Sequence, residues 1–305
     1  MEGESKSSNE SDTRPKVLII GAGMAGLICA RHVKDDCDVT VVETRDNFGG
    51  QWYYTDKNEQ NYPDIQNNAF YNLYGCLPSS LYAGVSLILP KFSMTFKDFP
   101  FPDDAPHVLS AEQFYNYICE YVRHFDLEKY ISYNTTVTKI KPVEGEERRY
   151  LVHTSPTDLT KAEEEKKEEF YDKVVICANH FSVPHIPDFE GLDEFEGVKM
   201  HMHHIKEVDP EIINGKNVLV VGVSISALDF VNMLFFKQPL CDTLNPNKVF
   251  ITSKNCSKMD TSDDYKAIIN EEKLCVKHGN VSKLESGKKV YFGDGTEETI
   301  DTIIF

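Results

Sequence analysis

The sequence predicts an α/β protein made of two units, each organised around a parallel β-sheet. A buried strand, a glycine-containing loop, a helix and a second buried strand follow one another between residues 17 and 43, and the same order returns between residues 217 and 253. Parallel strands joined by a crossover helix are covered on both faces, so they form continuous apolar runs like these. The length of 305 residues is also close to that of two domains.

In the first half, strands are predicted at residues 17–20 and 39–43, with a helix between them from Leu27 to Val33. Residues 44–109 show no long helical period and predict a long, packed excursion, which inside a compact domain is usually functional. A helix is predicted over residues 110–125, because a serine followed three residues later by a glutamine forms a capping-box pattern at its start.

Residues 131–175 are expected to form strands around a charged insert at residues 161–170, which we interpret as a solvated hairpin tip or loop. Prolines at positions 184 and 187 predict a crossing into the second unit. The chain ends inside an apolar segment, so a fragment or a short form is expected. Further strands are predicted at residues 174–178, 289–292 and 299–305.

The composition excludes several classes of protein. Hydrophobic residues make up 41% of the chain and charged residues 27%, which excludes general disorder. The net charge of −17 predicts no nucleic-acid partner, because an acidic surface repels phosphates. No apolar run approaches the ~20 residues that cross a bilayer, and the polar residues 1–14 lack the core of a signal peptide. We expect a cytoplasmic protein with a disordered tail over residues 1–14.

The first glycine loop has the pattern Gly21-Ala22-Gly23-Met24-Ala25-Gly26 and the context of a dinucleotide site. It follows a buried strand, opens a helix, and is followed 22 residues after Gly21 by Glu43 at the end of the next strand. Gly21 would make the tight turn, Gly23 would let the backbone approach a pyrophosphate, and Gly26 would let helix and strand pack closely. Glu43 would bind ribose hydroxyls. The alternative is a glycine-rich turn with an exposed glutamate.

A second glycine motif, Gly49-Gly50-Gln51-Trp52, follows soon after Glu43 and contains the only tryptophan. Gly50, Gln51 and Trp52 are candidates for a surface along which a dinucleotide continues past its pyrophosphate. The alternative is a turn with a buried indole.

The loop at residues 222–227 predicts a second dinucleotide site. Gly222 begins the loop, Ser224 stands where the middle glycine belongs, and Ser226 lies at the start of the expected helix. The Cβ of Ser224 is expected to restrict the backbone and to crowd a pyrophosphate. Lys254 follows the next strand and could bind a ribose 2′-phosphate, which favours NADP over NAD. The alternative is an ordinary turn with a surface lysine.

The sequence offers no candidate residues for a metal site, a dithiol motif or a hydrolase triad. His201 and His203 would share a face of an extended segment, but no cysteine or carboxylate stands at ligand spacing, so hydrogen-bonded histidines are favoured over a metal site. The eight cysteines form no C-x-x-C pair, and no G-x-S-x-G elbow is present. We therefore expect no metal site and no hydrolase triad.

Two dinucleotide loops on one chain indicate an oxidoreductase that uses a flavin and a nicotinamide. Over residues 15–305 the chain resembles the flavin-containing monooxygenases. The similar stretches, in order, are GAGMAG, ETRDNFGGQW, SSLYAGVSLILPKFSMTFKDFPFP, CANHFSVPHIPDFEGLDEFEGVKMH, VVGVSISALD and ITSKN.

The resemblance implies two Rossmann-like, three-layer domains: an FAD domain over residues 15–182 and an inserted NADPH domain over residues 183–298. Residues 299–305 would begin the return to the FAD domain. FAD would lie on the first loop, Glu43 and the Gly50-Gln51-Trp52 stretch, and NADPH near Gly222, Ser226 and Lys254. NADPH would reduce the flavin, and oxygen would add to it as a C4a-hydroperoxide. A small-molecule nucleophile would then be oxygenated at nitrogen or sulfur.

Three positions depart from the pattern of this family. Ile88 occupies the place of an asparagine that contacts the flavin and nicotinamide, and an apolar side chain donates no hydrogen bond. The fingerprint formed by Phe195, Gly197 and His201 ends at Ile205 instead of an aromatic residue, and Ser224 replaces a glycine. Three functions stay open: a working monooxygenase, an FAD-binding protein without oxygenation, and an NADPH oxidase that releases peroxide.

Overall fold

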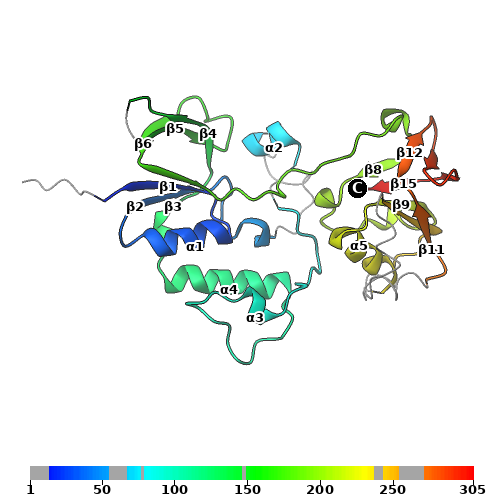
Figure 1. Ribbon diagram of the computed structural model, residues 1–305, viewed down its shortest axis with the longest axis horizontal. Coiled ribbons are helices and arrows are strands. Elements are labelled where there is room, and N and C mark those ends of the chain that lie inside the picture. The colour runs from blue at the N-terminus through cyan, green and yellow to red at the C-terminus, as the bar shows by residue number, and fades with distance from the viewer. Residues whose placement is uncertain (1–13, 55–66, 77–78, 146–148, 237–242, 254–270) are drawn as a thin grey trace, which may run out of the picture. The chain divides into compact units, whose positions relative to one another are not determined.

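The computed structural model describes residues 14–54, 67–76, 79–145, 149–236, 243–253 and 271–305 (Figure 1). The chain divides into two compact units, Met1–Val183 and Pro184–Phe305, which are described separately. Residues 1–13 of the expected tail lie outside the described residues, as does Lys254. Within the described part of the chain, no helix is both long and apolar enough to span a bilayer.

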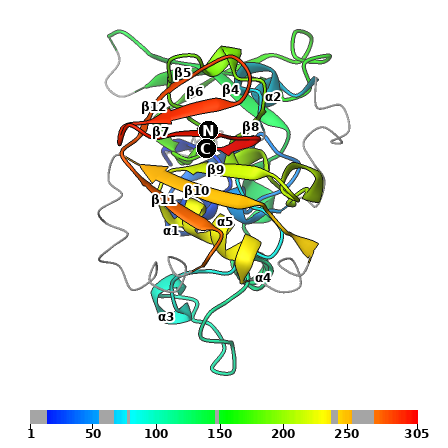
Figure 2. The same ribbon diagram turned by 90° about the vertical axis from the view of Figure 1, so that its right-hand side faces the viewer.

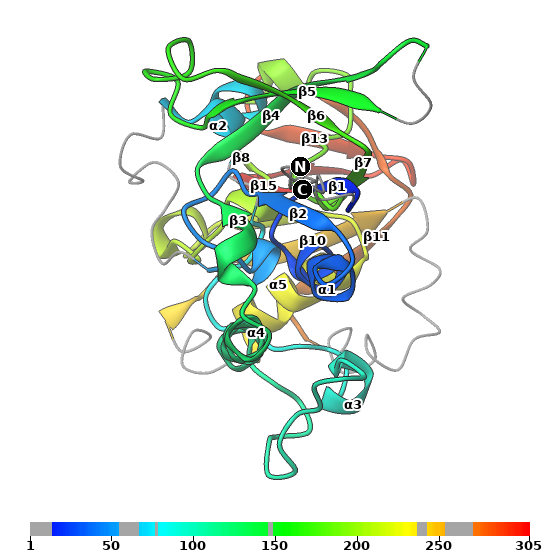
Figure 3. The same cartoon turned by 90° about the vertical axis from the view of Figure 1, so that its left-hand side faces the viewer.

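The first unit contains a four-stranded parallel sheet between two other layers (Figure 3). Its strand order is β3-β2-β1-β7, and every neighbouring pair is parallel. Helices α1 and α4 lie on one face, and an antiparallel sheet of order β4-β5-β6 lies on the other. The strands are β1 (Lys16–Ile20), β2 (Asp38–Val42), β3 (Ile131–Ser132), β4 (Thr135–Pro142), β5 (Tyr150–Pro156), β6 (Lys167–Tyr171) and β7 (Lys173–Ile176). The helices are α1 (Met24–Val33), η1 (Gly50–Trp52), α2 (Ala69–Tyr74), α3 (Lys91–Met94), α4 (Ala111–His124) and η4 (Glu128–Tyr130).

Alternation along β1 explains the three layers of this unit. Val17 and Ile19 belong to the core that includes Leu27 of α1, whereas Leu18 packs in a second core with Val152 of β5. Successive side chains of a strand point to opposite faces, so a strand that is apolar at every position needs a partner layer on each side. The expected three-layer α/β fold is confirmed here.

The capping box predicted for the helix over residues 110–125 is present. The Ser110 side chain accepts a hydrogen bond from the Gln113 backbone N–H, and the Gln113 side chain accepts one from the Ser110 backbone N–H. The expected excursion packs against this helix, because Phe101 stacks on Tyr117 with ring centroids 3.8 Å apart and Phe96 meets Tyr121 at 4.6 Å.

The second unit repeats the three-layer arrangement (Figure 2). Its parallel sheet has the order β11-β10-β9-β15-β8 and lies between helix α5 and an antiparallel sheet of order β12-β13-β14. Leu219, Phe250 and Ile303 of the parallel sheet share a core with Val290 and Phe292 of the antiparallel one. The strands are β8 (Val198–Met200), β9 (Asn217–Val221), β10 (Lys248–Ser253), β11 (Leu274–His278), β12 (Val281–Leu284), β13 (Lys289–Phe292), β14 (Glu297–Thr299) and β15 (Thr302–Ile304). The helices are η5 (Leu192–Glu194), η6 (Met202–His204), η7 (Pro210–Ile212) and α5 (Ile225–Phe235).

Two expectations about the later chain are wrong. The charged insert at residues 161–170 is not wholly a loop, because its second half forms β6, which pairs with β5 from Tyr150↔Tyr171 to Thr154↔Lys167. The segment 299–305 does not leave for the first unit. Its strand β15 pairs in parallel with both β9 and β8, and Ile303 and Ile304 are buried there. Two parallel ladders and an apolar core hold this strand in the second unit.

Candidate functional site

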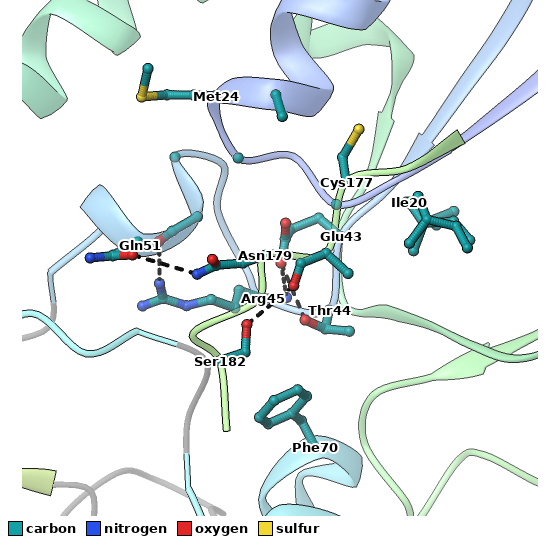
Figure 4. A pocket seen from close by; sticks show the side chains of 18 of the residues that line it. Ile20, Met24, Glu43, Thr44, Arg45, Gln51, Phe70, Cys177, Asn179 and Ser182 are labelled. Carbon is teal, nitrogen blue, oxygen red and sulfur yellow. Dashed lines mark hydrogen bonds between the residues drawn. The ribbon is translucent and has the colours of Figure 1, made fainter. Parts of the chain in front are cut away.

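The first unit contains a cavity of about 620 Å³ at the carboxyl ends of its parallel strands (Figure 4). Ile20, Val42 and Ile176, which end β1, β2 and β7, line it. This volume lies in the range of small-molecule and cofactor sites. Six residues predicted from the sequence also line the cavity: Gly21, Gly23, Glu43, Gly50, Gln51 and Trp52. The structure thus brings two separate sequence motifs to one place.

The first loop has no space for side chains at its outer glycines. Gly21 has φ +101°, and a Cβ there would lie 2.6 Å from the carbonyl oxygen of Cys177. A Cβ on Gly26, in the first turns of α1, would lie 1.9 Å from the carbonyl oxygen of Gly21. Helix α1 therefore approaches the loop at a distance that only glycine permits, and no acidic side chain occupies its first turn.

The motif at Gly49–Trp52 packs directly on this loop. The Gly49 N–H donates to the Ala22 carbonyl oxygen at 2.9 Å. Gly50 has φ +56°, and a Cβ on it would lie 2.8 Å from the Gly23 Cα. The two glycine motifs form one backbone cradle, an arrangement that the sequence did not indicate. Trp52 lines the cavity and also meets Phe114 edge-on at 4.7 Å, so its indole is partly packed, not buried as the alternative interpretation expected.

Glu43 is buried, and both of its carboxylate oxygens accept hydrogen bonds. Oε2 accepts from the Ala22 N–H at 2.7 Å, while Oε1 accepts from the Arg45 N–H at 3.0 Å and from the Thr44 hydroxyl at 3.2 Å. These bonds tie the end of β2 to the first glycine loop. An ionised carboxylate has about four lone-pair sites, so Glu43 keeps acceptor capacity toward hydroxyl groups in the cavity.

Arg45 is a buried cation in the cavity wall that sequence reasoning missed. Its Nη1 donates to the carbonyl oxygens of Gly50 at 3.0 Å and Tyr53 at 2.9 Å, and the guanidinium lies 4.4 Å from the centre of the Tyr53 ring. These contacts fix the shape of the Gly49–Trp52 turn. In the sequence, Arg45 is recognisable only as a basic residue two positions after Glu43. The spacing of the glycine loop and Glu43 does not predict its role.

Asn179 is a second lining residue that was missed. It has φ +63°, and its Oδ1 accepts from the backbone N–H groups of His180 at 2.7 Å and Phe181 at 3.2 Å. Its Nδ2 reaches Gln51 Oε1 at 3.5 Å, so this turn lies against the second glycine motif (Figure 4). Asparagine tolerates the left-handed conformation because its short amide bonds locally to the backbone.

The loop of the second unit has the same backbone conformation at its middle position. Ser224 has φ −91° and ψ 179°, close to φ −74° and ψ −179° at Gly23. The expectation that Ser224 restricts the backbone is therefore wrong, since this extended conformation suits any residue. Gly222 has φ +127°, while Ser224 and Ser226 are exposed at the start of α5, whose first turn holds no acidic residue.

The remaining family positions lie outside the cavity lining. Ile88 is 66% exposed, in a segment whose neighbours Leu87 and Lys91 donate backbone hydrogen bonds to Leu109 and His107. In the second unit, Phe195 is buried, and a Cβ on Gly197 would lie 2.5 Å from its ring.

The histidine segment is a helical turn, so the expectation of an extended segment is wrong. Met202–His204 forms η6, and Nδ1 of His201 accepts a hydrogen bond from the His203 N–H at 3.0 Å. Burial and the neighbouring histidines lower the pKa of His201 to about 4. Ile205 is buried at its place in the fingerprint. Among the residues that the structure describes, no group of three His, Cys, Asp or Glu side chains could hold a metal ion.

Comparisons with known proteins agree with this fold. The curated relatives include a flavin-containing monooxygenase named FMO GS-OX-like 9 from Arabidopsis thaliana, which is 28% identical over 297 residues, or 95% of this chain and 61% of the relative. Dimethylaniline monooxygenase [N-oxide-forming] 4 from Homo sapiens is 32% identical over 212 residues, or 68% of this chain and 34% of the relative.

A solved structure, Tmm from Pelagibacter sp. strain HTCC7211, matches 95% of this chain and 60% of its own, with a TM-score of 0.73 and 26% identity. The chain therefore spans less than two thirds of each of these three proteins. A family model, FMO-like (Flavin-binding monooxygenase-like), matches residues 14–257. With this match added to the two three-layer units and the glycine cradle, the chain belongs to the flavin-binding monooxygenase-like family.

Proposed function

We propose that this protein is an NADPH-dependent flavoprotein monooxygenase that transfers one oxygen atom from O2 to a soft nitrogen or sulfur nucleophile. The observation that carries the proposal is the glycine cradle of the first unit. It places the Gly21–Gly26 loop, the Gly49–Trp52 turn and the buried Glu43 around one cavity.

The cradle has the features that FAD needs. No side chain caps the backbone N–H groups at the start of α1 and no acidic residue lies in its first turn, which suits a pyrophosphate. Gly23 and Gly50 let the two glycine motifs pack directly on each other, and both residues line the cavity. Glu43 would accept hydrogen bonds from ribose hydroxyls, and Gln51 and Trp52 would lie along the rest of the dinucleotide. Arg45 would hold the turn that carries them.

NADPH would lie on the second unit, against Gly222, Ser224 and Ser226 at the start of α5. The support is the conformation of this loop, which matches the first loop at its middle position. The Cβ of Ser224 is expected to crowd the pyrophosphate. Lys254 is proposed for the ribose 2′-phosphate on sequence grounds.

When bound, FAD would accept a hydride from NADPH and activate O2, so that one oxygen atom enters the substrate and the other leaves as water. The residues of this chain would bind and orient the nucleotides and exclude water from them. Oxygenation at nitrogen agrees with the name of the human N-oxide-forming relative. The substrate and O2 are the proposed small-molecule partners.

A second candidate function is an FAD-binding protein that releases peroxide or does not react with O2 at all. The observation that favours it is Ile88, an exposed apolar side chain at the place of a family asparagine. Ile88→Asn separates the two candidates. The variant would lower peroxide release per NADPH if this position protects the oxygenated flavin. Unchanged coupling would contradict the assignment of the position.

The first test is an absorbance spectrum of the purified chain with added FAD, before and after anaerobic NADPH. A protein-bound flavin spectrum that bleaches, followed by oxygenation of a tertiary amine or a sulfide in air, supports the monooxygenase. A bound flavin that does not bleach supports the FAD-binding protein. No bound flavin would overturn both candidates.

A further inference from the structure

Helix α2 belongs to the wall of the cavity, although no glycine or charged motif points to it. This six-residue helix lies within the excursion between β2 and α4. Its Phe70 lines the cavity together with Thr44, Val137 and Ser182. In Figure 4 the ring projects from α2 on the side where Thr44 and Ser182 are drawn. An aromatic side chain is therefore part of a site otherwise built mostly from loops and strand ends.

Hydrogen bonds anchor α2 at both ends, so the backbone that carries the Phe70 ring is held in place. At the start, Asn68 Oδ1 accepts from the Phe70 N–H at 3.0 Å, and the Ala69 N–H donates to the Thr157 carbonyl oxygen at 2.8 Å. Beyond the other end, the thiol of the fully buried Cys76 lies 3.6 Å from the carbonyl oxygen of Ser182, which also lines the cavity. A side chain on an anchored backbone loses less conformational entropy on binding a ligand than one on an unanchored segment.

The anchors place α2 at the end of the cavity that contains Glu43. The Glu43 carbonyl oxygen accepts from the Thr135 N–H at 2.9 Å. The next residue, Thr136, shares a hydroxyl hydrogen bond of 2.9 Å with Thr157, the residue that holds Ala69. A short chain of contacts thus connects the backbone of Glu43, whose carboxylate is proposed to bind the ribose, with the residue before Phe70.

We infer that Phe70 is a specificity residue that packs against the adenine ring of the bound dinucleotide. The inference rests on the proposed function, in which Glu43 holds the ribose that carries this adenine. Adenine has a flat apolar face, and Phe70 and Val137 supply apolar surface at this end of the cavity. Contact with an aromatic ring favours any adenine-containing ligand over a flavin mononucleotide, which lacks the base.

The test compares Phe70→Ala and Phe70→Leu with wild type by titration with FAD, ADP and FMN. Leu73→Ala is the matched control, because Leu73 lies on the same short helix but is 70% exposed and does not line the cavity. Thermal melts of every variant show whether the fold is kept. Phe70→Ala is expected to raise the Kd for FAD and for ADP about tenfold, with a smaller rise for Phe70→Leu. The Kd for FMN and the behaviour of Leu73→Ala should not change.

The outcomes separate the inference from the proposed function. If Phe70→Ala binds FAD with the same Kd as wild type, the role of Phe70 is contradicted and the flavoprotein proposal stays intact. An equal loss for FMN and FAD would place Phe70 against the flavin ring and overturn the adenine assignment. A wild-type chain that binds neither FAD nor ADP would contradict both.

Discussion

The two glycine loops of this chain have nearly the same backbone but different surroundings. At the middle position, Gly23 and Ser224 are both extended. At the first position, a Cβ on Gly21 would lie 2.6 Å from the Cys177 carbonyl oxygen, whereas nothing lies within 4 Å of a Cβ built on Gly222. At the place of the third glycine of the pattern, the first loop needs Gly26, whereas the second loop has the buried Ala227. The contrast teaches that close approach by other groups makes glycine necessary at Gly26, whereas positive φ alone favours glycine at Gly222.

The largest expected effect comes from adding one methyl group where the first loop has no room. Gly26→Ala should lower the free energy of unfolding by about 2–4 kcal/mol, because its Cβ would lie 1.9 Å from the Gly21 carbonyl oxygen and α1 would have to move. The matched change in the second unit, Ala227→Gly, should cost about 1 kcal/mol, the usual helix penalty of glycine. Urea unfolding of both variants measures the difference. Equal losses would contradict the distinction between the loops.

The second prediction concerns the place where the two motifs of the first unit meet. Gly50→Ala should weaken FAD binding at least tenfold, because its Cβ would lie 2.8 Å from the Gly23 Cα and would spread the cradle. Fluorescence titration with FAD measures this effect. Gly145→Ala is the control, since Gly145 also has positive φ but a Cβ there meets no atom within 4 Å. If both variants bind FAD alike, the contact between the motifs does not matter for the site.

The sequence predicted most of the regular structure, because buried parallel strands and a capping box are local signals. It also placed Glu43 and both glycine motifs of the first unit at one cavity. It did not show that Gly23 and Gly50 touch, nor that Arg45 and Phe70 complete the wall, because these contacts join segments that are distant in the chain. The placement of β15 was missed for the same reason. A short apolar run does not reveal which sheet it joins.

The third prediction uses His201, a titratable group of the second unit. Its pKa is about 4 in the folded chain and about 6.5 when unfolded, so between these values only the unfolded chain binds the proton. Stability that is fully present above pH 6.5 should therefore fall as the pH drops toward 4, by about 1 kcal/mol. Urea unfolding at a series of pH values measures the slope. His201→Gln should flatten the profile in this window, and an unchanged profile would show that other groups cause the loss.

The smallest expected effect on stability comes from placing glycine at the middle position of the second loop. Ser224→Gly should change the free energy of unfolding by only a few tenths of a kcal/mol, because the backbone is already extended and the side chain makes no capping hydrogen bond. The effect of this substitution on the Kd for NADPH depends on whether the Cβ or the hydroxyl of Ser224 dominates. If the Cβ crowds the pyrophosphate, as we expect, the Kd for NADPH should fall a few-fold. A rise would mean that the hydroxyl holds a phosphate, so Ser224→Ala, which keeps the Cβ and removes the hydroxyl, distinguishes the two causes. If Ser224→Ala binds NADPH as wild type does and Ser224→Gly binds it more tightly, the Cβ atom alone causes the difference in NADPH affinity.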